Sequence, residues 1–528
     1  MKNQLTISDE DLATRLWVHD PTHLGFAMTP LFQSFMIPAV GKAMAKLART
    51  SERPPRDHEL RIYHGYAYNA SMGDADGPDG EQRRAALEAM RPAFPNIRKD
   101  FERIVREELL PAYDELDRLT YGLKSREDAS HALEKLVDLY ETIWTLHMQI
   151  VMPVFASQEL YEKVFLELFP NKTATDAHDL LVGASNQFVE ADRAFAQLAD
   201  GARDVPYVRK ALLGPDPISA LSETPEGKAF FYELESTLER FGWRVGAGHD
   251  FYQKTWREDP TPALATIRQF LESDRPFEQH WQETVARHHR LLEDVLNQLN
   301  PDQRTRFEEA FRVAWEARPI DEDHHFYIDA MLPAKARSLL VRIGEILREE
   351  GTLATSEQIF FLYRDELKNM LSGTYPVDTT HLESRRALYF QYCQETPPLT
   401  LGNHSAGEWS KGEPSGESGV IHGLAASGGV WEGAVRIIRG VNDFARLKTG
   451  EVLAARTTTP SWSGLFSTAG AVVTDSGGVL SHAATVAREY RVPCVVAARH
   501  ATEELKDGDI VRVDGNQGTV TMIRPQKS

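Results

Sequence analysis

The sequence predicts a multidomain protein in which a large, mainly helical domain is followed by a small α/β domain. Three observations support this fold class. Apolar residues recur with helical spacing from about residue 75 to 375, a segment rich in Gly, Ser, Glu and Pro follows near residue 400, and short β-branched runs fill the remainder. A chain of 528 residues is also too long for a single hydrophobic core.

The helical domain is expected to span residues 1–400. Segments such as "FERIVREELLPAYDELDRL" and "FEQHWQETVARHHRLLEDVLNQL" place apolar residues at i, i+3, i+4 and i+7, which is typical of amphipathic helices. Prolines cluster in "DPTPA" and "ARPID", where we expect helices to stop. The alternating segment "ELRIYHGYAYNA" instead predicts a short strand or a hairpin.

A linker and a smaller domain are expected to follow. Residues 401–419, "LGNHSAGEWSKGEPSGESG", contain almost no aliphatic side chains and are typical of a flexible linker. In residues 420–528 one helix is expected from about Ser481 to Tyr490. Strands are predicted for the runs "VWEGAVRIIRG", "GEVLAAR", "GAVVTDSGG", "VPCVVAA", "DGDIVRVDG" and "GTVTMIR".

Composition and charge narrow the classes of partner. The formal net charge of −19 argues against nucleic acid and against an anionic membrane surface. The two cysteines, Cys393 and Cys494, form no CxxC pair and no HExxH motif is present, so we expect neither a disulfide scaffold nor a metal site. The N-terminus lacks the apolar run of a signal peptide, and no window of eighteen apolar residues occurs. We therefore expect a cytoplasmic protein without a membrane span.

The segment "DSGGVLSHAATVAR", residues 475–488, is the strongest candidate for chemistry and raises two alternatives. Its first four residues resemble the nucleophile loop of a serine protease, in which Ser476 would be the nucleophile. Such a site needs a histidine and an aspartate well upstream in a β-barrel, whereas the upstream chain here has a helical pattern. We therefore expect Ser476 to be a turn residue and His482 to be the reactive one.

His482 is expected at the first position of a helix. Ser481 is a favourable N-cap, and Gly477 and Gly478 allow a tight turn with room for a ligand. The positive end of the helix dipole disfavours an imidazolium, so we expect a neutral, nucleophilic ring near pH 7. The same unpaired amides favour a phosphoryl group on that ring. On these residues alone, a transient phosphohistidine and a histidine that merely caps a helix are equal alternatives.

The C-terminal region resembles the mobile phosphohistidine (swivelling) domain of the phosphoenolpyruvate-utilising enzymes. The likeness rests on "GGVLSHAATVAREYRVPCVVAA", close to the family pattern GGxxSHxAIVARExxIPAVVG, and extends over residues 420–525. The resemblance implies that His482 is the phosphorylated residue. It also implies that Gly477, Gly478 and Ser481 shape the phosphate-binding loop, and that Arg488 matches the family's arginine. The departure at Ala497-Ala498 affects packing more than chemistry.

Full-length relatives carry an ATP-grasp domain that charges the histidine. The N-terminal part of this chain lacks the alternating strands and the Gly-rich lid of that domain, and has no GxxxxGK(S/T) motif. The resemblance therefore implies a separate ATP-grasp subunit, which would use ATP and Mg²⁺. We expect no cofactor on this chain itself.

The helical domain resembles the substrate-binding part of rifampicin phosphotransferase. It also resembles two histidine-bearing subunits: that of phenylphosphate synthase, and that of the synthase that phosphorylates 4-methylphenol (4-methylbenzyl phosphate synthase). The shared stretches are "DPTHLGFAMTPLF", "LRIYHGYAYN", "RFGWRVGAGHDFYQKTWREDP", "DEDHHFYIDA" and "IFFLYRDEL". The resemblance implies that residues 1–400 form the phosphoryl-acceptor domain. The chain departs from the usual patterns at residues 242–248 and 323–329, so the identity of the acceptor stays open.

Transfer to a hydroxyl needs a base, cations around the phosphoryl oxygens and an apolar wall for the acceptor. His324 and His325 are candidate bases, because neighbouring aspartates would orient an imidazole; the alternative is a solvated helix start with acidic residues in its first turn. Arg244 and Arg257 are candidate phosphate ligands, with ordinary ion pairing to Glu258 and Asp259 as the alternative. Four residues are candidates for binding the substrate ring: Tyr63, Tyr66, Trp144 and His147. The alternative for each is packing in the hydrophobic core.

The sequence thus predicts one subunit of a dikinase-type phosphotransferase of aromatic compound catabolism. A partner ATP-grasp subunit phosphorylates His482, the small domain swings on the linker, and a small phenol or alkylphenol such as 4-cresol receives the phosphoryl group. The resemblance implies that the products are AMP, phosphate and an aryl phosphate. Two alternatives stay open: a non-enzymatic phosphocarrier whose helical part docks proteins, and a phosphotransferase acting on an antibiotic-like polyol.

Overall fold

This computed structural model of the chain describes residues 5–19, 24–50, 59–71, 89–245, 248–273, 276–374, 379–403, 419–459 and 462–524. The chain folds into two compact units. The first comprises Met1–Ala156, Gly248–Gln253 and Tyr327–Gly412, and the second comprises Ser157–Ala247, Lys254–Phe326 and Glu413–Ser528. The chain therefore passes between the units repeatedly, and neither unit is one continuous segment.

The first unit contains a four-stranded antiparallel sheet in the order β2–β3–β1–β4. Strands β2 (Leu60–Tyr63) and β3 (Tyr66–Ser71) form the hairpin predicted in "ELRIYHGYAYNA", and the turn between them places His64 and Gly65 at positive φ. Strand β1 (Leu16–His19) pairs with β4 (Thr400–Gly402), which lies far away in the sequence. No local pattern indicated that pairing.

Helices form the rest of the first unit. The long helix α7 (Arg126–Leu168) begins in the first unit and ends in the second, with Pro153 inside it. The buried rings of Phe35, Tyr140 and Phe251 contact one another, with centroids 5.5–5.7 Å apart. The other helical segments of this unit are α2 (Asp9–Thr14), α3 (Pro30–Thr50), η1 (Arg91–Asn96), α5 (Ile97–Ile104), η2 (Val105–Leu109), α6 (Leu110–Gly122), α16 (Met331–Glu349), η4 (Ser356–Phe361), α17 (Arg364–Leu371) and α18 (Thr379–Tyr392).

The second unit combines a helical part with an α/β part. In the helical part, a cluster of buried aromatic side chains that includes Tyr161, Phe165 and Phe307 joins α7 to α15. The helices are α8 (Ala174–Asp179), α9 (Gln187–Arg203), α10 (Pro206–Leu213), α11 (Pro217–Ser222), α12 (Pro225–Phe241), α13 (Thr261–Glu272), α14 (Phe277–Leu296) and α15 (Pro301–His324), and the π-helical segment η3 (His325–Ala330) follows α15.

One prediction about helix ends is wrong. Pro262 of "DPTPA" lies in the first turn of α13, as expected, but Pro319 of "ARPID" lies inside α15. The acidic segment after Pro319 is therefore the C-terminal end of a helix and not a solvated helix start. Glu322 and His324 are buried there, so tertiary packing has outweighed the local preference of proline.

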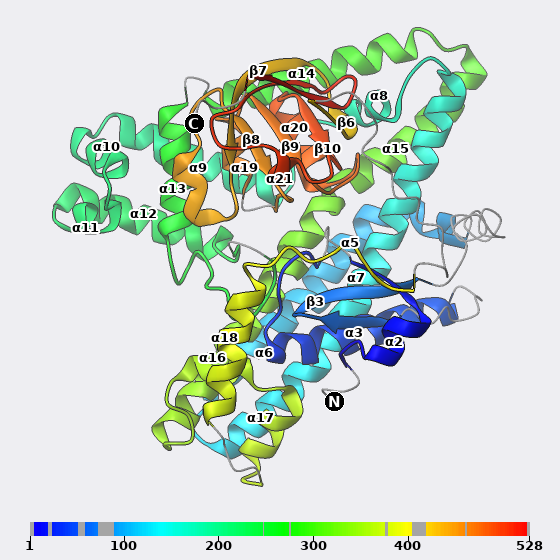
Figure 1. Ribbon diagram of the computed structural model, residues 1–528. Coiled ribbons are helices and arrows are strands. Elements are labelled where there is room, and N and C mark those ends of the chain that lie inside the picture. The colour runs from blue at the N-terminus through cyan, green and yellow to red at the C-terminus, as the bar shows by residue number, and fades with distance from the viewer. Residues whose placement is uncertain are drawn as a thin grey trace. The chain divides into compact units, whose positions relative to one another are not determined.

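The α/β part, residues 419–524, is built on a mixed sheet in the order β5–β12–β11–β7–β8–β9–β10–β6. The four strands β7 to β10 are parallel, and the other pairs are antiparallel. Helix α20 (His482–Tyr490) connects β9 (Ala471–Thr474) to β10 (Cys494–Val496) and lies against the strands (Figure 1). The other elements are β5 (Val420–His422), β6 (Leu424–Ser427), β7 (Val430–Ile437), η6 (Val441–Arg446), β8 (Val452–Ala455), α19 (Ser463–Phe466), α21 (Ala501–Glu504), β11 (Ile510–Asp514) and β12 (Thr519–Arg524).

Two apolar clusters form the core of this α/β part. The first contains Leu453 and Val472 of the sheet together with Ala484 and Ala487 of α20. The second gathers the alternate side chains of the same strands with apolar residues around α21 and on β11 and β12. Because successive strand residues point to opposite faces, both faces of the central strands are covered.

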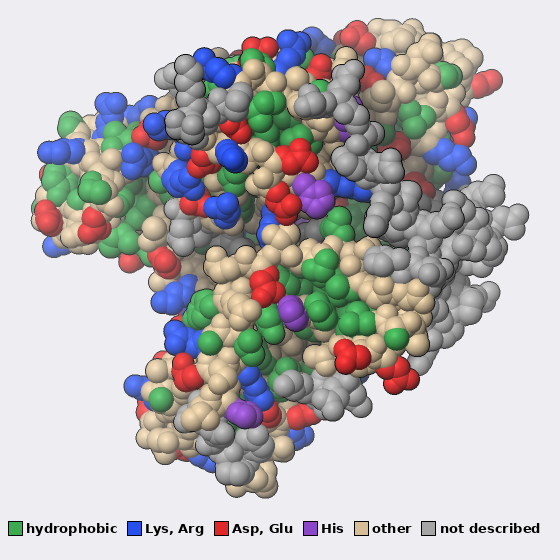
Figure 2. All heavy atoms as spheres, in the orientation of Figure 1, with side chains coloured by type: hydrophobic (Ala, Val, Ile, Leu, Met, Phe, Trp, Pro, Cys, Tyr) green, Lys and Arg blue, Asp and Glu red, His purple; other side chains and the backbone are tan. Residues whose placement is uncertain are grey.

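The predicted fold class is confirmed: a mainly helical protein ends in a small α/β domain. The predicted linker, residues 401–419, falls largely on residues 404–418, which lie outside the described residues, so the division into 1–400, 401–419 and 420–528 stays a prediction. Across the described ranges, no helix is long and apolar enough to cross a membrane. On the face drawn in Figure 2, Lys and Arg side chains lie among Asp and Glu side chains.

Candidate active site

His482 lies where the central parallel strands end, at the first residue of α20. Ser481 is the N-cap in an extended conformation, and its hydroxyl accepts a hydrogen bond from the Ala484 amide (3.5 Å). Gly477 has a φ of 118°, and a Cβ at this position would lie 2.9 Å from Ser481 Oγ. The loop therefore requires glycine at 477, and the sequence prediction of a tight turn before a capped helix is confirmed.

The neighbouring loop residues have plainer roles. Gly478 is not among the residues with positive φ, and an added Cβ would meet nothing within 4 Å, so the space beside it is open. The Ser476 hydroxyl donates to the Arg456 carbonyl oxygen (2.9 Å) and holds the turn. This contact fits the expected structural role of Ser476 and not the role of a protease nucleophile.

The His482 side chain is buried, with 8% of its surface exposed. Among the described residues, neither Nδ1 nor Nε2 has a hydrogen-bond partner. The ring lines a cavity whose empty volume, counted with its opening to solvent, is about 400 Å³. Phe188, Phe277, Trp281 and Tyr490 give the cavity an aromatic lining. Two buried nitrogens thus lie beside an apolar space, where a reacting group would satisfy them.

Glu322 of α15 supplies the nearest charged group to the imidazole. Its Oε2 atom lies 3.5 Å from His482 Nδ1, in ion-pair range but longer than an ordinary hydrogen bond, and its Oε1 atom lies 3.5 Å from Arg318 Nη2. Burial alone would raise the pKa of Glu322, but the contact and charge of His482, with Arg318 and His325, lower that pKa to about 2. Glu322 is therefore a carboxylate at neutral pH.

Asp192 of α9 is the second carboxylate in the cavity wall. It accepts hydrogen bonds from Ser463 Oγ (3.0 Å) and the Tyr490 hydroxyl (3.3 Å), and it lies 3.5 Å from Arg244 Nη1. Burial raises the pKa of Asp192, and Arg244, Ser463 and Tyr490 oppose that rise only in part. A buried carboxylate with a raised pKa, beside an aromatic space, is a candidate proton acceptor.

Further contacts join the α/β part to the helices of the second unit. Thr284 Oγ1 donates to the Glu489 carbonyl oxygen (3.1 Å), and His280 Nε2 lies 3.0 Å from the same oxygen. Burial raises the pKa of the Glu489 carboxyl to about 8, with nearby Arg318 opposing the rise, so this group is largely neutral at pH 7. These contacts hold the C-terminal end of α20 against α14.

Two predicted phosphate ligands are engaged elsewhere in the structure. Arg488 is buried and donates to the Ala426 carbonyl oxygen (2.9 Å), and burial lowers its pKa to about 10. Arg257 lies over the Trp243 ring, 4.4 Å from its centroid. Arg244 does reach the cavity wall, through its ion pair with Asp192. The phosphate-binding role of all three stays a prediction.

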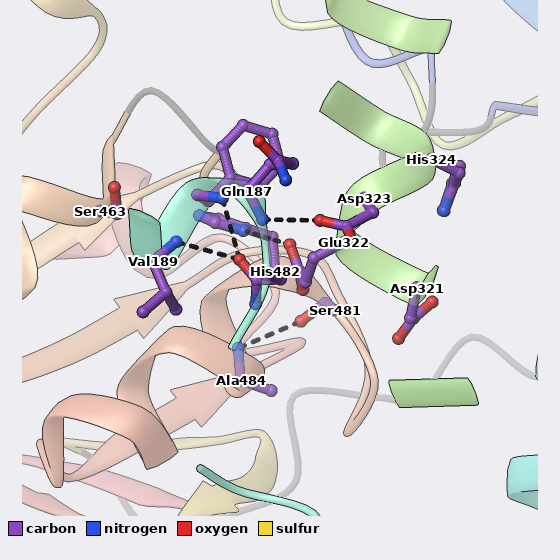
Figure 3. A network of polar contacts seen from close by, with 12 residues as sticks. Gln187, Val189, Asp321, Glu322, Asp323, His324, Ser463, Ser481, His482 and Ala484 are labelled. Atoms are coloured by element: carbon purple, nitrogen blue, oxygen red, sulfur yellow. Dashed lines mark hydrogen bonds and ion pairs between the residues drawn. The ribbon is translucent and has the colours of Figure 1, made fainter. Parts of the chain in front are cut away.

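His324, one of the two candidate bases, lies on another side of α15 from Glu322. Figure 3 shows the Glu322 side chain directed toward His482, whereas Asp321 and His324 lie on the far side of the helix. His324 Nδ1 is 3.1 Å from the Ile320 carbonyl oxygen, and the His324 and His325 ring centroids are 3.9 Å apart. The structure therefore brings His482 together with Glu322 and not with His324.

The four predicted substrate-binding residues belong to the first unit. The Tyr66 hydroxyl donates to the Tyr392 carbonyl oxygen (2.8 Å), and the Tyr63 ring stacks on His64 with centroids 4.3 Å apart. Trp144 and His147 share a face of α7, with ring centroids 4.7 Å apart, and both are buried. Tyr66, Trp144 and His147 are buried, which agrees with the alternative of core packing, whereas Tyr63 is partly buried against the exposed His64. The substrate-binding role of all four stays a prediction.

Sequence reasoning missed Asp192, Glu322, Ser463 and Tyr490. Neither carboxylate offered a signal in the sequence, because an acidic residue in a helix usually faces water. The burial of Asp192 and Glu322 is seen only in the folded structure.

Comparisons with known proteins agree with this geometry. Residues 447–518 match the family described as "PEP-utilising enzyme, mobile domain", which includes His482 and its loop. The C-terminal domain therefore matches the description of this family. Residues 146–320 match the "Rifampicin phosphotransferase fourth domain", which includes Asp192 and ends two residues before Glu322. The mobile domain of this chain, as we now call residues 420–524, therefore follows a domain of the rifampicin phosphotransferase type.

Three relatives match longer stretches of the chain, and two of them are named phosphotransferases. An uncharacterised phosphotransferase, YvkC of Bacillus subtilis, is 31% identical over 99% of this chain and 63% of its own length. Chondramide synthase cmdD of Chondromyces crocatus is 29% identical over 97% of this chain and 14% of its own length. Rifampicin phosphotransferase of B. subtilis is 32% identical over 54% of this chain and 34% of its own length. The chain thus spans less than two thirds of each of these relatives.

Proposed function

We propose that this chain is a phosphotransferase component in which His482 carries a phosphoryl group to the hydroxyl of a small aromatic acceptor. One observation carries the proposal: the buried imidazole of His482, at the N-terminus of α20, lines an aromatic cavity with two carboxylates in its wall. Among the described residues, neither nitrogen of this ring has a hydrogen-bond partner. A helix N-terminus favours a phosphoryl group, and the aromatic wall favours an aryl ring.

His482 receives its phosphoryl group from ATP on an ATP-grasp kinase module, which we propose to be a separate subunit that also holds the Mg²⁺. A ring nitrogen of His482 attacks the β-phosphorus of ATP, an N–P bond forms, and the bond between the α- and β-phosphates breaks, so that AMP leaves. Water then breaks the bond between the β- and γ-phosphates, which releases phosphate and leaves one phosphoryl group on His482. The mobile domain then returns on the predicted linker, residues 401–419, to the helices of the second unit.

The acceptor binds in the cavity beside His482. Its ring lies against Phe188, Phe277 and Trp281, and its hydroxyl gives a proton to Asp192 as its oxygen attacks phosphorus. The O–P bond forms, the N–P bond breaks, and the electron pair returns to the imidazole. The aromatic lining of the cavity favours an aryl ring over a polyol. Burial of His482 keeps water from the phosphoryl group.

The test follows AMP release and radiolabel from ATP. The chain is mixed with the ATP-grasp subunit, ATP, Mg²⁺ and a panel of phenols, with a bulky polyol as a comparison. We expect label on His482 and AMP release that depends on a phenol. His482→Ala should abolish both, while His422→Ala, an exposed histidine on β5 of the same domain, should abolish neither. Labelling of His482 without transfer to any small acceptor would instead show a phosphocarrier, and absence of label on His482 would contradict the whole proposal.

A further inference from the structure

We propose that Glu322 is a positioning residue that activates the phosphorylated His482 for transfer. The inference rests on the proposed function. In it, the phosphoryl group is on Nε2, and the Glu322 carboxylate holds a proton on Nδ1 while the mobile domain lies against α15. The acceptor side of the protein, and not the mobile domain, supplies this carboxylate.

The geometry fixes the carboxylate firmly. Arg318 lies 3.5 Å from Glu322 Oε1 and also donates to Asp321 Oδ2 (2.5 Å), so the guanidinium is held from two sides. The side chains of Arg318, Glu322 and His482 expose only 6–8% of their surfaces. A carboxylate held in this way presents its second oxygen, Oε2, to Nδ1 and leaves Nε2 to the reaction.

The charge of Glu322 decides which ring nitrogen carries the proton. A carboxylate accepts hydrogen bonds and donates none, so it favours an N–H on the nitrogen that faces it and disfavours a lone pair there. The low pKa of Glu322 keeps this group ionised throughout the neutral range. Nδ1 therefore carries the proton and Nε2 carries the lone pair or the phosphoryl group.

The Nδ1 proton makes the imidazole a better leaving group. When the N–P bond breaks in a ring protonated at Nδ1, the electron pair returns to Nε2 and neutral imidazole leaves. When Nδ1 has lost its proton, the leaving group is an anionic imidazolate, and the barrier is higher. The proton stays on Nδ1 throughout, and the acceptor's own proton goes to Asp192 as described above. Glu322 thus acts through His482 and touches neither phosphorus nor acceptor.

The two half-reactions therefore depend on Glu322 differently. Charging of His482 takes place on the kinase module, where α15 supplies no carboxylate to Nδ1. Transfer takes place beside α15 and depends on Glu322. Because the phosphorylated ring lacks this partner while it is away from α15, it is also less prone to lose its phosphoryl group to water there.

The experiment measures the two half-reactions separately with Glu322→Gln, which keeps the shape and removes the charge. Asp323→Asn is the matched control, because Asp323 is adjacent on the same segment and its carboxylate accepts from the Gln187 amide (2.6 Å), not from His482. For Glu322→Gln we expect normal charging of His482 and transfer to phenol slowed at least tenfold at pH 8. The defect should shrink as the pH falls to 6, because Nδ1 of the phosphorylated ring then gains its proton from solvent. Asp323→Asn should charge and transfer like the unmodified chain.

Two outcomes would overturn the inference. In the first, Glu322→Gln transfers the phosphoryl group as fast as the unmodified chain. In the second, the variant loses the same fraction of the transfer rate at every pH, which is what a purely structural role of Glu322 predicts. Nitrogen NMR of the ¹⁵N-histidine-labelled chain, with His482→Ala to assign the signal, gives a second readout that needs no ATP. The unmodified chain should hold its proton on Nδ1, and a proton on Nε2 would contradict us. If His482 is never charged in the unmodified chain, the proposed function fails, while the NMR result still judges Glu322 alone.

Discussion

Asp192 offers the sharpest test of how the mobile domain is held against the helices. Asp192 and Arg244 expose 5% and 2% of their side chains, and Asp192 also accepts hydrogen bonds from Ser463 and Tyr490 of the mobile domain. Removing one partner of a buried ion pair costs about 3–5 kcal/mol, because the other charge stays buried. We therefore expect Asp192→Ala to lower the free energy of unfolding of the second unit by about that amount. The double variant Asp192→Ala/Arg244→Met should recover at least half of the loss, because the buried charge is then gone.

The assay is urea unfolding followed by tryptophan fluorescence. Trp256 is a suitable reporter, since its ring centroid lies 5.4 Å from Arg244 Cζ and its side chain is buried. Midpoints and slopes for the unmodified chain, the single variant and the double variant give the two differences in unfolding free energy. A loss below about 1 kcal/mol for Asp192→Ala, or a double variant no more stable than the single one, would refute the argument that this ion pair carries a buried, mutually compensated charge.

Three further predictions concern the loop and the helix around His482. Gly477→Ala should lower the free energy of unfolding by about 1–3 kcal/mol and slow charging of His482, because a φ of 118° is strained for alanine and its Cβ would lie 2.9 Å from Ser481 Oγ. Gly478→Ala is the control, because its Cβ would meet nothing within 4 Å. Equal melting temperatures for the two variants would contradict this prediction. Ser481→Ala should lower the free energy of unfolding in denaturant by about 1 kcal/mol, because it removes the N-cap of α20. Ser481→Asn should retain most of that stability, since asparagine is also a good N-cap. An Asn variant as unstable as the Ala variant would exclude the capping role. The pKa of Glu489 is raised from 4.5 to about 8 in the folded chain, so the folded chain keeps a proton that the unfolded chain loses between these pH values. Stability should therefore fall as the pH rises from about 5 to 8, and Glu489→Gln should reduce the fall in melting temperature over that range. The same fall in the variant would contradict the raised pKa of Glu489.

The loop that carries His482 could be predicted from sequence because its determinants are neighbours in the chain. Ser481 caps the helix that begins at His482, and Gly477 permits the turn before it, so a short stretch of sequence specifies the local geometry. Strands β7 to β12 were predictable for a similar reason, since most of them are short β-branched runs bounded by Gly, Asp or Pro, whereas β5 and β6 were not predicted.

The partners of His482 could not be predicted in this way. Asp192 and Glu322 belong to helices far upstream, and they come close to His482 and Tyr490 only in the folded second unit. Helical periodicity shows which side of a helix is apolar, but not which other element will cover its polar side. The same limit explains why His324 and His325 were favoured as bases: their residue type suggested chemistry, while the orientation of α15 directs Glu322 to the ring.

The small sheet of the first unit also determines where the predicted linker is attached. Strand β4 is hydrogen-bonded along β1, and the hydroxyls of Tyr66 and Tyr68 hold the carbonyl oxygens of Tyr392 and Pro398, so the chain is fastened down as far as Gly402. In the proposed function, the linker to the small α/β domain therefore starts from β4, which β1 holds in place. A truncated variant without the first seventy residues would lose β1, so the free segment before the α/β domain would be longer. We expect the effective concentration of His482 at the proposed acceptor site to fall in that variant, although every residue named at the site would still be present.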